Sequence, residues 1–190
     1  MSLEAFVVST GAVALGEIGD KTQLLALLLA ARFRRPLPII AGIVVATLLN
    51  HTGAAALGAW LAHALDPQWL RWGLGLSFVA VALWMLVPDK AEQGPTRTIG
   101  HLGVFGLTAV SFFLAEMGDK TQIATAMLAA RYQALVPVIA GTTLGMLLAD
   151  VPAVLLGERA VRLLPAAWVH RIAAAVFAAI GVAMLLGVGA

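Results

Sequence analysis

One hexapeptide occurs twice in the chain and carries most of its chemically capable side chains. The two copies occupy residues 17–22 and 116–121, and each reads Glu-x-Gly-Asp-Lys-Thr. Each copy places two carboxylates and one ammonium group in the middle of a long apolar stretch. An ionisable side chain inside a membrane-spanning segment is costly, so it points by default to a functional site. The two copies are therefore the candidate functional centre.

The spacing within each copy predicts a cluster of charges on one helix face. Positions i, i+3 and i+4 of a continuous helix are neighbours, so the Glu, Asp and Lys of a copy would project together. The charged members of the two copies are Glu17, Asp20, Lys21, Glu116, Asp119 and Lys120. Gly19 and Gly118 would let a facing helix approach closely, as small residues do in membranes.

The formal charge of this cluster suggests what it would bind. Four carboxylates and two ammonium groups leave −2, which one divalent cation or two protons would neutralise. This arithmetic suits an exchanger in which the cation and protons compete for the same carboxylates. Oxygen ligands in a chain without cysteine favour hard ions such as Ca²⁺, Mg²⁺ and Mn²⁺ over zinc or copper. Gln23 and Gln122 would extend the oxygen surface.

An alternative interpretation pairs the charges within each copy, Glu17 with Lys21 and Glu116 with Lys120, so that they only fix helix packing. Buried ion pairs are poor stabilisers because desolvation offsets their attraction. Such pairing would also leave two carboxylates uncompensated. The lysines themselves either tune the carboxylates and hold the empty site, or serve packing alone.

Two further polar residues, His51 and Asp150, occupy equivalent positions 99 residues apart. His51 lies in an uncharged run and would carry a proton in the physiological pH range. Asp150 would face the cavity or a membrane surface. Both are candidates for a proton relay, although a single buried histidine is also common as a packing residue.

Composition places the chain in a bilayer. The 190 residues are 61% hydrophobic and only 12% charged, where soluble domains carry about a quarter charged residues. The mean hydropathy is +0.95. A formal charge of +2 gives no reason to expect nucleic-acid binding. The oligomeric state stays open, a homo-oligomer included.

Six apolar segments approach the length of about 20 residues that a spanning helix needs. They cover residues 3–31, 37–62, 71–87, 101–130, 135–157 and 168–189. An ungapped shift of 99 residues superposes the first three on the last three. The sequence therefore predicts an all-α integral membrane protein with six transmembrane helices. Its two three-helix repeats would span 1–87 and 100–190, joined by a cytoplasmic linker at 88–99.

An odd number of helices per repeat requires the second repeat to enter the membrane inverted. Eight of the twelve Lys and Arg residues fall in the odd-numbered connections: Arg32, Arg34, Arg35, Lys90, Arg97, Arg159, Arg162 and Arg171. The positive-inside rule then places these connections in the cytoplasm and both termini outside. Inverted repeats around a midplane site are typical of secondary transporters.

The doubled motif resembles the Ca²⁺/Mn²⁺ cation–proton antiporter family, which includes eukaryotic Golgi manganese/calcium transporters and bacterial MneA-type manganese exporters. The resemblance covers essentially the whole chain. It implies that Glu17, Asp20, Glu116 and Asp119 bind the cation, with support from Thr22, Thr121 or the neighbouring glutamines. It also implies a bacterial-type member in the cytoplasmic (inner) membrane that exports Mn²⁺, or Ca²⁺, against protons.

Two rival functions remain at this stage. A small six-helix exporter of organic cations or amino acids would share the duplicated layout but would need a larger cavity with an aromatic cage. An intramembrane enzyme or a scaffold subunit is the other, and His51 alone is thin support for hydrolytic chemistry. We therefore expect a transporter and no enzyme, with no resident cofactor and with the divalent metal ion and protons as transient ligands.

Overall fold

A computed structural model describes residues 2–87, 103–157 and 166–187. All regular secondary structure in these ranges is α-helical. The predicted linker at 88–99 lies outside the described residues, as do four of the basic residues used for orientation: Lys90, Arg97, Arg159 and Arg162.

The described helices follow one another with short connections. They are α1 (Ser2–Glu17), α2 (Lys21–Phe33), α3 (Pro36–Ala64), α4 (Pro67–Met85), α5 (Gly103–Glu116), α6 (Lys120–Tyr132), α7 (Leu135–Leu156) and α9 (Ala166–Leu185). The predicted segments 37–62, 71–87, 135–157 and 168–189 each correspond to one helix. The other two segments, 3–31 and 101–130, do not.

The prediction of continuous helices through the two motifs is wrong. Both helices break inside the hexapeptide, and α1 and α2 meet at an angle of 70°. Gly19 and Gly118 take φ values of +86° and +79°, which L side chains rarely adopt and which end a helix. The following Asp20 and Asp119 are extended and begin the next helix. The glycines therefore turn the chain.

The offset of 99 residues recurs in the helix ends. α1 and α5 both end at the motif glutamate, and α2 and α6 both begin at the motif lysine. The residues that end α2 and α6, Arg34 and Gln133, are both left-handed, with φ of 51° and 49°. Two segments that differ in many side chains thus fold into the same succession of elements.

Proline and side-chain caps start several helices. Pro36 and Pro67 stand at the first positions of α3 and α4, where a missing N–H costs nothing. The Asp66 carboxylate accepts a hydrogen bond from the Gln68 N–H at 2.9 Å and caps α4. These local signals fix the turn between α3 and α4.

Three described helices are long and apolar enough to cross a membrane: α3, α7 and residues 167–185 of α9. The bent pair α1 and α2 makes a fourth candidate span if it counts as one. α5 is apolar but shorter. The fold is thus all-helical, with three to four candidate spans among the described residues.

Small residues set the closest helix crossings. α1 packs most extensively on α7, and α5 packs closely on α3. A Cβ at Gly141 would meet the Phe6 carbonyl oxygen at 2.5 Å, and one at Gly42 would meet the Phe105 carbonyl oxygen at 2.9 Å. The two contacts are equivalent under the offset of 99, which relates Gly42 to Gly141 and Phe6 to Phe105. Glycine is required at both crossings because backbone occupies the space.

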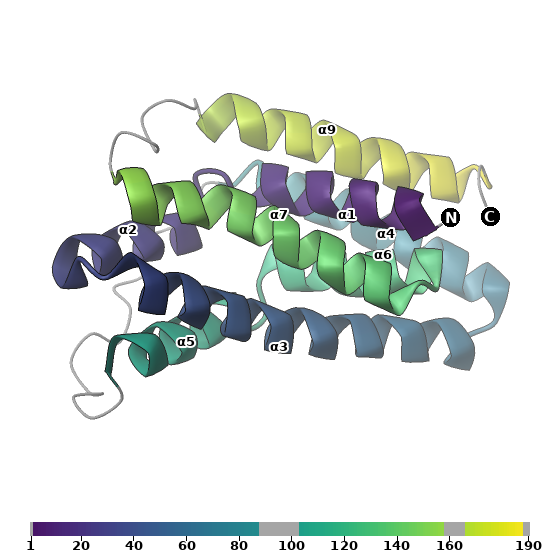
Figure 1. Cartoon of the computed structure of the whole chain (residues 1–190). Helices are drawn as coiled ribbons and strands as arrows, with labels where there is room; N and C mark the ends of the chain where they lie inside the picture. The colour runs from purple at the N-terminus through teal and green to yellow at the C-terminus, as the bar shows by residue number, and fades with distance from the viewer. Residues whose placement is uncertain (1, 88–102, 158–165, 188–190) are drawn as a thin grey trace.

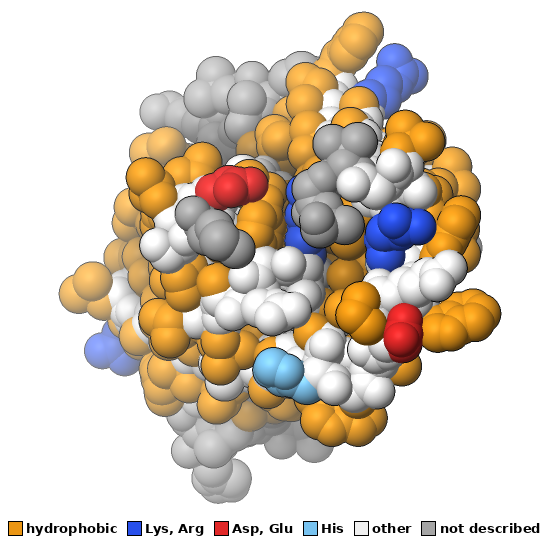
Figure 2. Space-filling view, turned by 90° about the vertical axis from the view of Figure 1, so that its right-hand side faces the viewer, with side chains coloured by type: hydrophobic (Ala, Val, Ile, Leu, Met, Phe, Trp, Pro, Cys, Tyr) orange, Lys and Arg blue, Asp and Glu red, His pale blue; other side chains and the backbone are white. Residues whose placement is uncertain are grey.

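Figure 1 shows the helices as one bundle in which α3 and α7 run in opposite directions, as do α1 and α9. The start of α1 and the end of α9 lie at the same end of the bundle. Seen onto that end, the molecule is ringed by hydrophobic side chains, and few charged ones are visible (Figure 2). Many large apolar side chains are exposed, including Trp60, Trp69 and Trp168. Such a surface fits hydrocarbon better than water.

Candidate cation site

The first motif forms a tight turn between α1 and α2. Glu17 is the last residue of α1, and Asp20 is the N-cap of α2. The Asp20 Oδ1 atom accepts a hydrogen bond from the Lys21 N–H at 2.7 Å. Gln23 Oε1 accepts from the Gly19 N–H at 2.9 Å, which satisfies a donor that the helix break leaves free. The glutamine therefore supports the turn.

The second motif repeats this geometry between α5 and α6. Gln122 Oε1 accepts from the Gly118 N–H at 2.8 Å. Asp119 has nearly the backbone angles of Asp20, with φ −78° and ψ 163° against −82° and 172°. No side-chain cap bond is formed by Asp119. Its carboxylate is turned toward other partners.

The structure also corrects the role predicted for Gly118. A Cβ added at Gly118 would meet nothing within 4 Å, so no facing helix approaches closely there. What the position requires is the positive φ. Because each motif is a turn between two helices, its three charges do not share one helix face as the spacing predicted.

The motif threonines orient the glutamates. Thr22 Oγ1 donates to Glu17 Oε2 at 2.6 Å, and Thr121 Oγ1 donates to Glu116 Oε2 at 3.1 Å. The remaining oxygen of each glutamate, Oε1, is buried and has no hydrogen-bond partner among the described residues. Each glutamate thus offers one oriented but unused oxygen, which an unfilled polar site requires and a packing residue does not.

The lysines pair across the two motifs. Lys21 Nζ lies 3.1 Å from Asp119 Oδ1, and Lys120 Nζ lies 3.0 Å from Asp20 Oδ2. The alternative of pairing within each motif, from glutamate to lysine, is not what the structure shows. The two pairs differ in accessibility, because the Lys21 side chain is 20% exposed and the Lys120 side chain only 1%.

Three carboxylates converge in a cluster whose oxygens are close enough together to hold one metal ion. Glu17, Asp20 and Asp119 each offer an oxygen, and these atoms lie within 4.8 Å of one another. All three side chains are buried. Glu116 stands outside this group, but it too is fully buried and the charges of Asp20 and Asp119 act on it. Like charges at this spacing repel unless a cation or protons intervene.

Helix ends add fixed dipoles to the site. The C-terminus of α1 and the N-terminus of α2 meet at the first motif, and those of α5 and α6 meet at the second. The positive end of a helix dipole favours the aspartates that begin α2 and α6, and the exposed carbonyls at the negative ends of α1 and α5 favour a cation.

Asp150 and His51 are both fully buried, and their side-chain polar atoms have no hydrogen-bond partners among the described residues. The charges of Glu17 and Asp20 act on Asp150, so it belongs to the surroundings of the cluster. Its neighbour Ala149 accepts a hydrogen bond from Gln23 Nε2 at 2.9 Å, which ties α7 to the first motif. Within the described ranges, no hydrogen bond links His51 to the acids.

One contact near His51 had no interpretation from the sequence. Asn50 Nδ2 donates to the Phe113 carbonyl oxygen at 3.1 Å and ties α3 to α5. Three buried hydroxyl groups also have no hydrogen-bond partner within the described part of the chain: Ser9, Thr47 and Thr143. The sequence shows only that these polar residues stand in apolar runs. It does not show which neighbouring helix each of them faces.

Comparison with known proteins identifies the family. The model of the family "Divalent cation/proton antiporter GDT1" matches residues 5–93 and 104–189. A protein of Vibrio cholerae serotype O1 named "Putative manganese exporter" is 51% identical over 178 residues, which are 93% of this chain and 87% of that protein. No solved structure matches at a significant level.

Plant proteins are more distant. The "GDT1-like protein 4" of Oryza sativa subsp. indica is 28% identical over 166 residues, which are 75% of this chain and 59% of that protein. The subsp. japonica protein of the same name is equally similar, with 58% of its length covered. The chain thus spans less than two thirds of the plant relatives. It belongs to the GDT1 family of divalent cation/proton antiporters, and it is a membrane transporter of cations, not an enzyme.

Proposed function

We propose that this chain exports Mn²⁺ from the cytoplasm in exchange for protons, with Ca²⁺ as the second candidate substrate. The observation that carries the proposal is the convergence of buried Glu17, Asp20 and Asp119 oxygens, from both halves of the chain, within 4.8 Å. A site built only for packing would not bring three acids together in an apolar interior, because the desolvation penalty is large.

The proposed ligands are the four motif acids. Glu17, Asp20 and Asp119 bind the cation directly, and Glu116 completes the set through its unpartnered Oε1. Carboxylate oxygens without sulfur suit Mn²⁺, Ca²⁺ and Mg²⁺. The name of the Vibrio cholerae relative, "Putative manganese exporter", supports Mn²⁺ as the first candidate.

The neighbouring side chains support the ligands. Thr22 and Thr121 hold the glutamates, and Gln23 and Gln122 hold the motif turns. Lys21 and Lys120 neutralise the aspartates when no cation is bound. The lysine ammonium must withdraw from an aspartate before that carboxylate can bind metal fully.

Protons return by the same carboxylates. When the cation leaves, protons bind to the acids and neutralise them, and the protonated site can then reorient. The cation and the protons therefore never occupy the site together. Asp150, whose oxygens are unpartnered and near the first motif, is the stronger proton-relay candidate. His51 is the second, and it is equally buried.

The proposed architecture is six membrane-spanning segments in two inverted repeats, 1–87 and 100–190, joined by a cytoplasmic linker. Support comes from the offset of 99 in the helix ends, the antiparallel course of α3 and α7, and the reciprocal glycine crossings. We place the protein in a bacterial inner membrane with both termini outside, as the distribution of basic residues favours.

Ion flux in proteoliposomes tests the function. Purified protein is reconstituted with a pH-sensitive dye inside, and Mn²⁺, Ca²⁺ or Mg²⁺ is added outside. Uptake of Mn²⁺ accompanied by proton release from the vesicles is expected, and Glu17→Gln should abolish both.

The control is Glu4→Gln, which changes an exposed acid on the same helix and should transport normally. Cation flux without proton movement would contradict exchange. If the reconstituted protein is folded but transports none of the three ions, the proposed substrate class is contradicted.

A further inference from the structure

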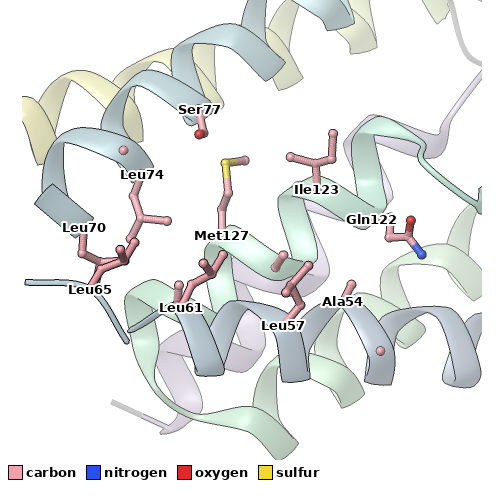
Figure 3. Close-up of a pocket in the computed structure, with 14 residues that line it drawn as sticks. Ala54, Leu57, Leu61, Leu65, Leu70, Leu74, Ser77, Gln122, Ile123 and Met127 are labelled. Carbon is pink, nitrogen blue, oxygen red and sulfur yellow. The ribbon is translucent and has the colours of Figure 1, made fainter. Parts of the chain in front are cut away.

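An apolar cavity lies apart from the acidic cluster, between α3, α4 and α6. Its volume is 480 Å³, within the range of about 300–1,000 Å³ found for small-molecule sites. Figure 3 shows leucines of α3 below the cavity, leucines of α4 at its upper left, and Ile123 and Met127 of α6 beside them. Ser77 and Gln122 are the polar side chains in the lining.

The cavity is bordered by apolar side chains that are exposed on the surface of the molecule. Leu57 and Ile123 are 53% and 38% exposed, and both contribute to its wall. At its far end lies Leu65, the residue that follows α3, and the exposed Trp60 and Trp69 are near it in the sequence. Exposed tryptophans of membrane proteins gather at the level of the lipid headgroups. The cavity therefore runs from the level of the headgroups toward the second motif.

This cavity is unfavourable both when it is filled with water and when it is empty. An apolar cavity offers water too few hydrogen-bond partners, and an empty one forfeits dispersion contacts along its walls. In a protein surrounded by bilayer, the abundant molecule of matching polarity and shape is a lipid acyl chain. We propose that this cavity is a binding site for one acyl chain of a bilayer phospholipid.

Two glycines in the wall show that the space is open. A Cβ added at Gly53 or at Gly73 would meet no atom within 4 Å. Several other helical glycines lie against the backbone of a neighbouring helix, as Gly42 does, whereas these two glycines are not needed for close packing. The Cβ of a leucine at either position would meet no other atom, its side chain would stand in the cavity wall, and leucine would raise the helix propensity.

The inner end of the cavity reaches Gln122, the residue that follows the second motif. Gln122 lines it, and the same side chain accepts the Gly118 N–H that stabilises the turn before Asp119. A chain in the cavity therefore contacts a residue that shapes the cation site. The binding site itself does not depend on the proposed substrate.

The test uses a phosphatidylethanolamine that carries a photoreactive diazirine in one acyl chain. Full-length protein reconstituted with this lipid is irradiated, digested and analysed by mass spectrometry. Adducts are expected on the lining residues of α6, especially Met127, and should be lost in Gly73→Leu.

Gly11→Leu is the matched control, because a Cβ there also meets nothing within 4 Å and the position lies outside the cavity wall. Its labelling should equal that of the unchanged protein. If Gly73→Leu does not fold, Gly53→Leu replaces it. Absence of adducts at Met127 in the unchanged protein, or undiminished labelling in a folded leucine variant, would overturn the proposal.

Discussion

The ammonium group of Lys120 lies 3.0 Å from the carboxylate of Asp20, and the two residues come from opposite halves of the chain. Both side chains are almost fully buried. Removing one partner of a buried pair leaves an uncompensated charge and typically costs about 3–5 kcal/mol. Since Asp20 is also a proposed metal ligand, a bound divalent cation should replace the missing charge.

We therefore expect Lys120→Met to lower the thermal midpoint in cation-free detergent and to enlarge the stabilisation produced by Mn²⁺. A bound ligand stabilises the folded state by RT ln(1 + L/Kd), where L is the free ligand concentration, so at a fixed Mn²⁺ concentration a larger shift reports tighter binding. Lys21→Met is the comparison variant, and its partly exposed pair should give a smaller effect. Equal loss of stability with and without Mn²⁺ would assign Lys120 to packing alone.

Replacing Gly118 should destabilise the turn of the second motif. Gly118→Ala forces a residue with a Cβ into φ +79°, although the space around it is free. A left-handed conformation costs a residue with a Cβ roughly 1–2 kcal/mol relative to glycine. We expect a lower thermal midpoint and weaker Mn²⁺ binding.

Gly11→Ala isolates the conformational term, because Gly11 lies inside α1 and also has free space around it. Alanine in a helix interior is more favourable than glycine by up to about 1 kcal/mol. This variant should be neutral or stabilising. A loss of stability equal to that of Gly118→Ala would show that the positive φ is not what the motif needs.

Thr22 should act through Glu17. Thr22→Val keeps the shape but removes the hydroxyl that donates to Glu17 Oε2 at 2.6 Å. Leaving a buried polar group unsatisfied costs about 1–3 kcal/mol. We expect weaker cation binding in isothermal titration, with Thr22→Ser restoring it. Unchanged affinity in Thr22→Val would mean that Glu17 needs no orienting donor.

The absence of cysteine makes the topology directly testable, since any introduced thiol is the only one in the chain. Cysteines replacing Ser2 and Gly187 should react with an impermeant maleimide in intact cells. A cysteine replacing Arg34, at the turn between α2 and α3, should react only after permeabilisation. The reverse pattern would contradict the proposed orientation.

The sequence was a good guide to the helices outside the motifs. Charged and proline-containing breaks at 32–36 and 66–67 placed the ends of α2, α3 and α4 within a few residues. The offset of 99 also predicted that equivalent elements recur. These features depend on local chemistry, which the sequence contains.

The motif turn was misread for an identifiable reason. Apolar runs on both sides of Glu17 favour one long helix, and that pattern outweighed the glycine followed by aspartate. Glycine is common just after a helix and aspartate just before one. The exchange of lysine partners between halves could not be predicted, because it depends on how α2 and α6 meet in space.

The reciprocal lysine pairs make the two halves of the chain depend on each other. Each half supplies the counter-charge for an aspartate of the other, so neither motif can lose its lysine without leaving a carboxylate of the other half unbalanced. A second substitution that compensates for the loss of Lys120 is therefore expected at Asp20, in the other half of the chain, and not within its own motif.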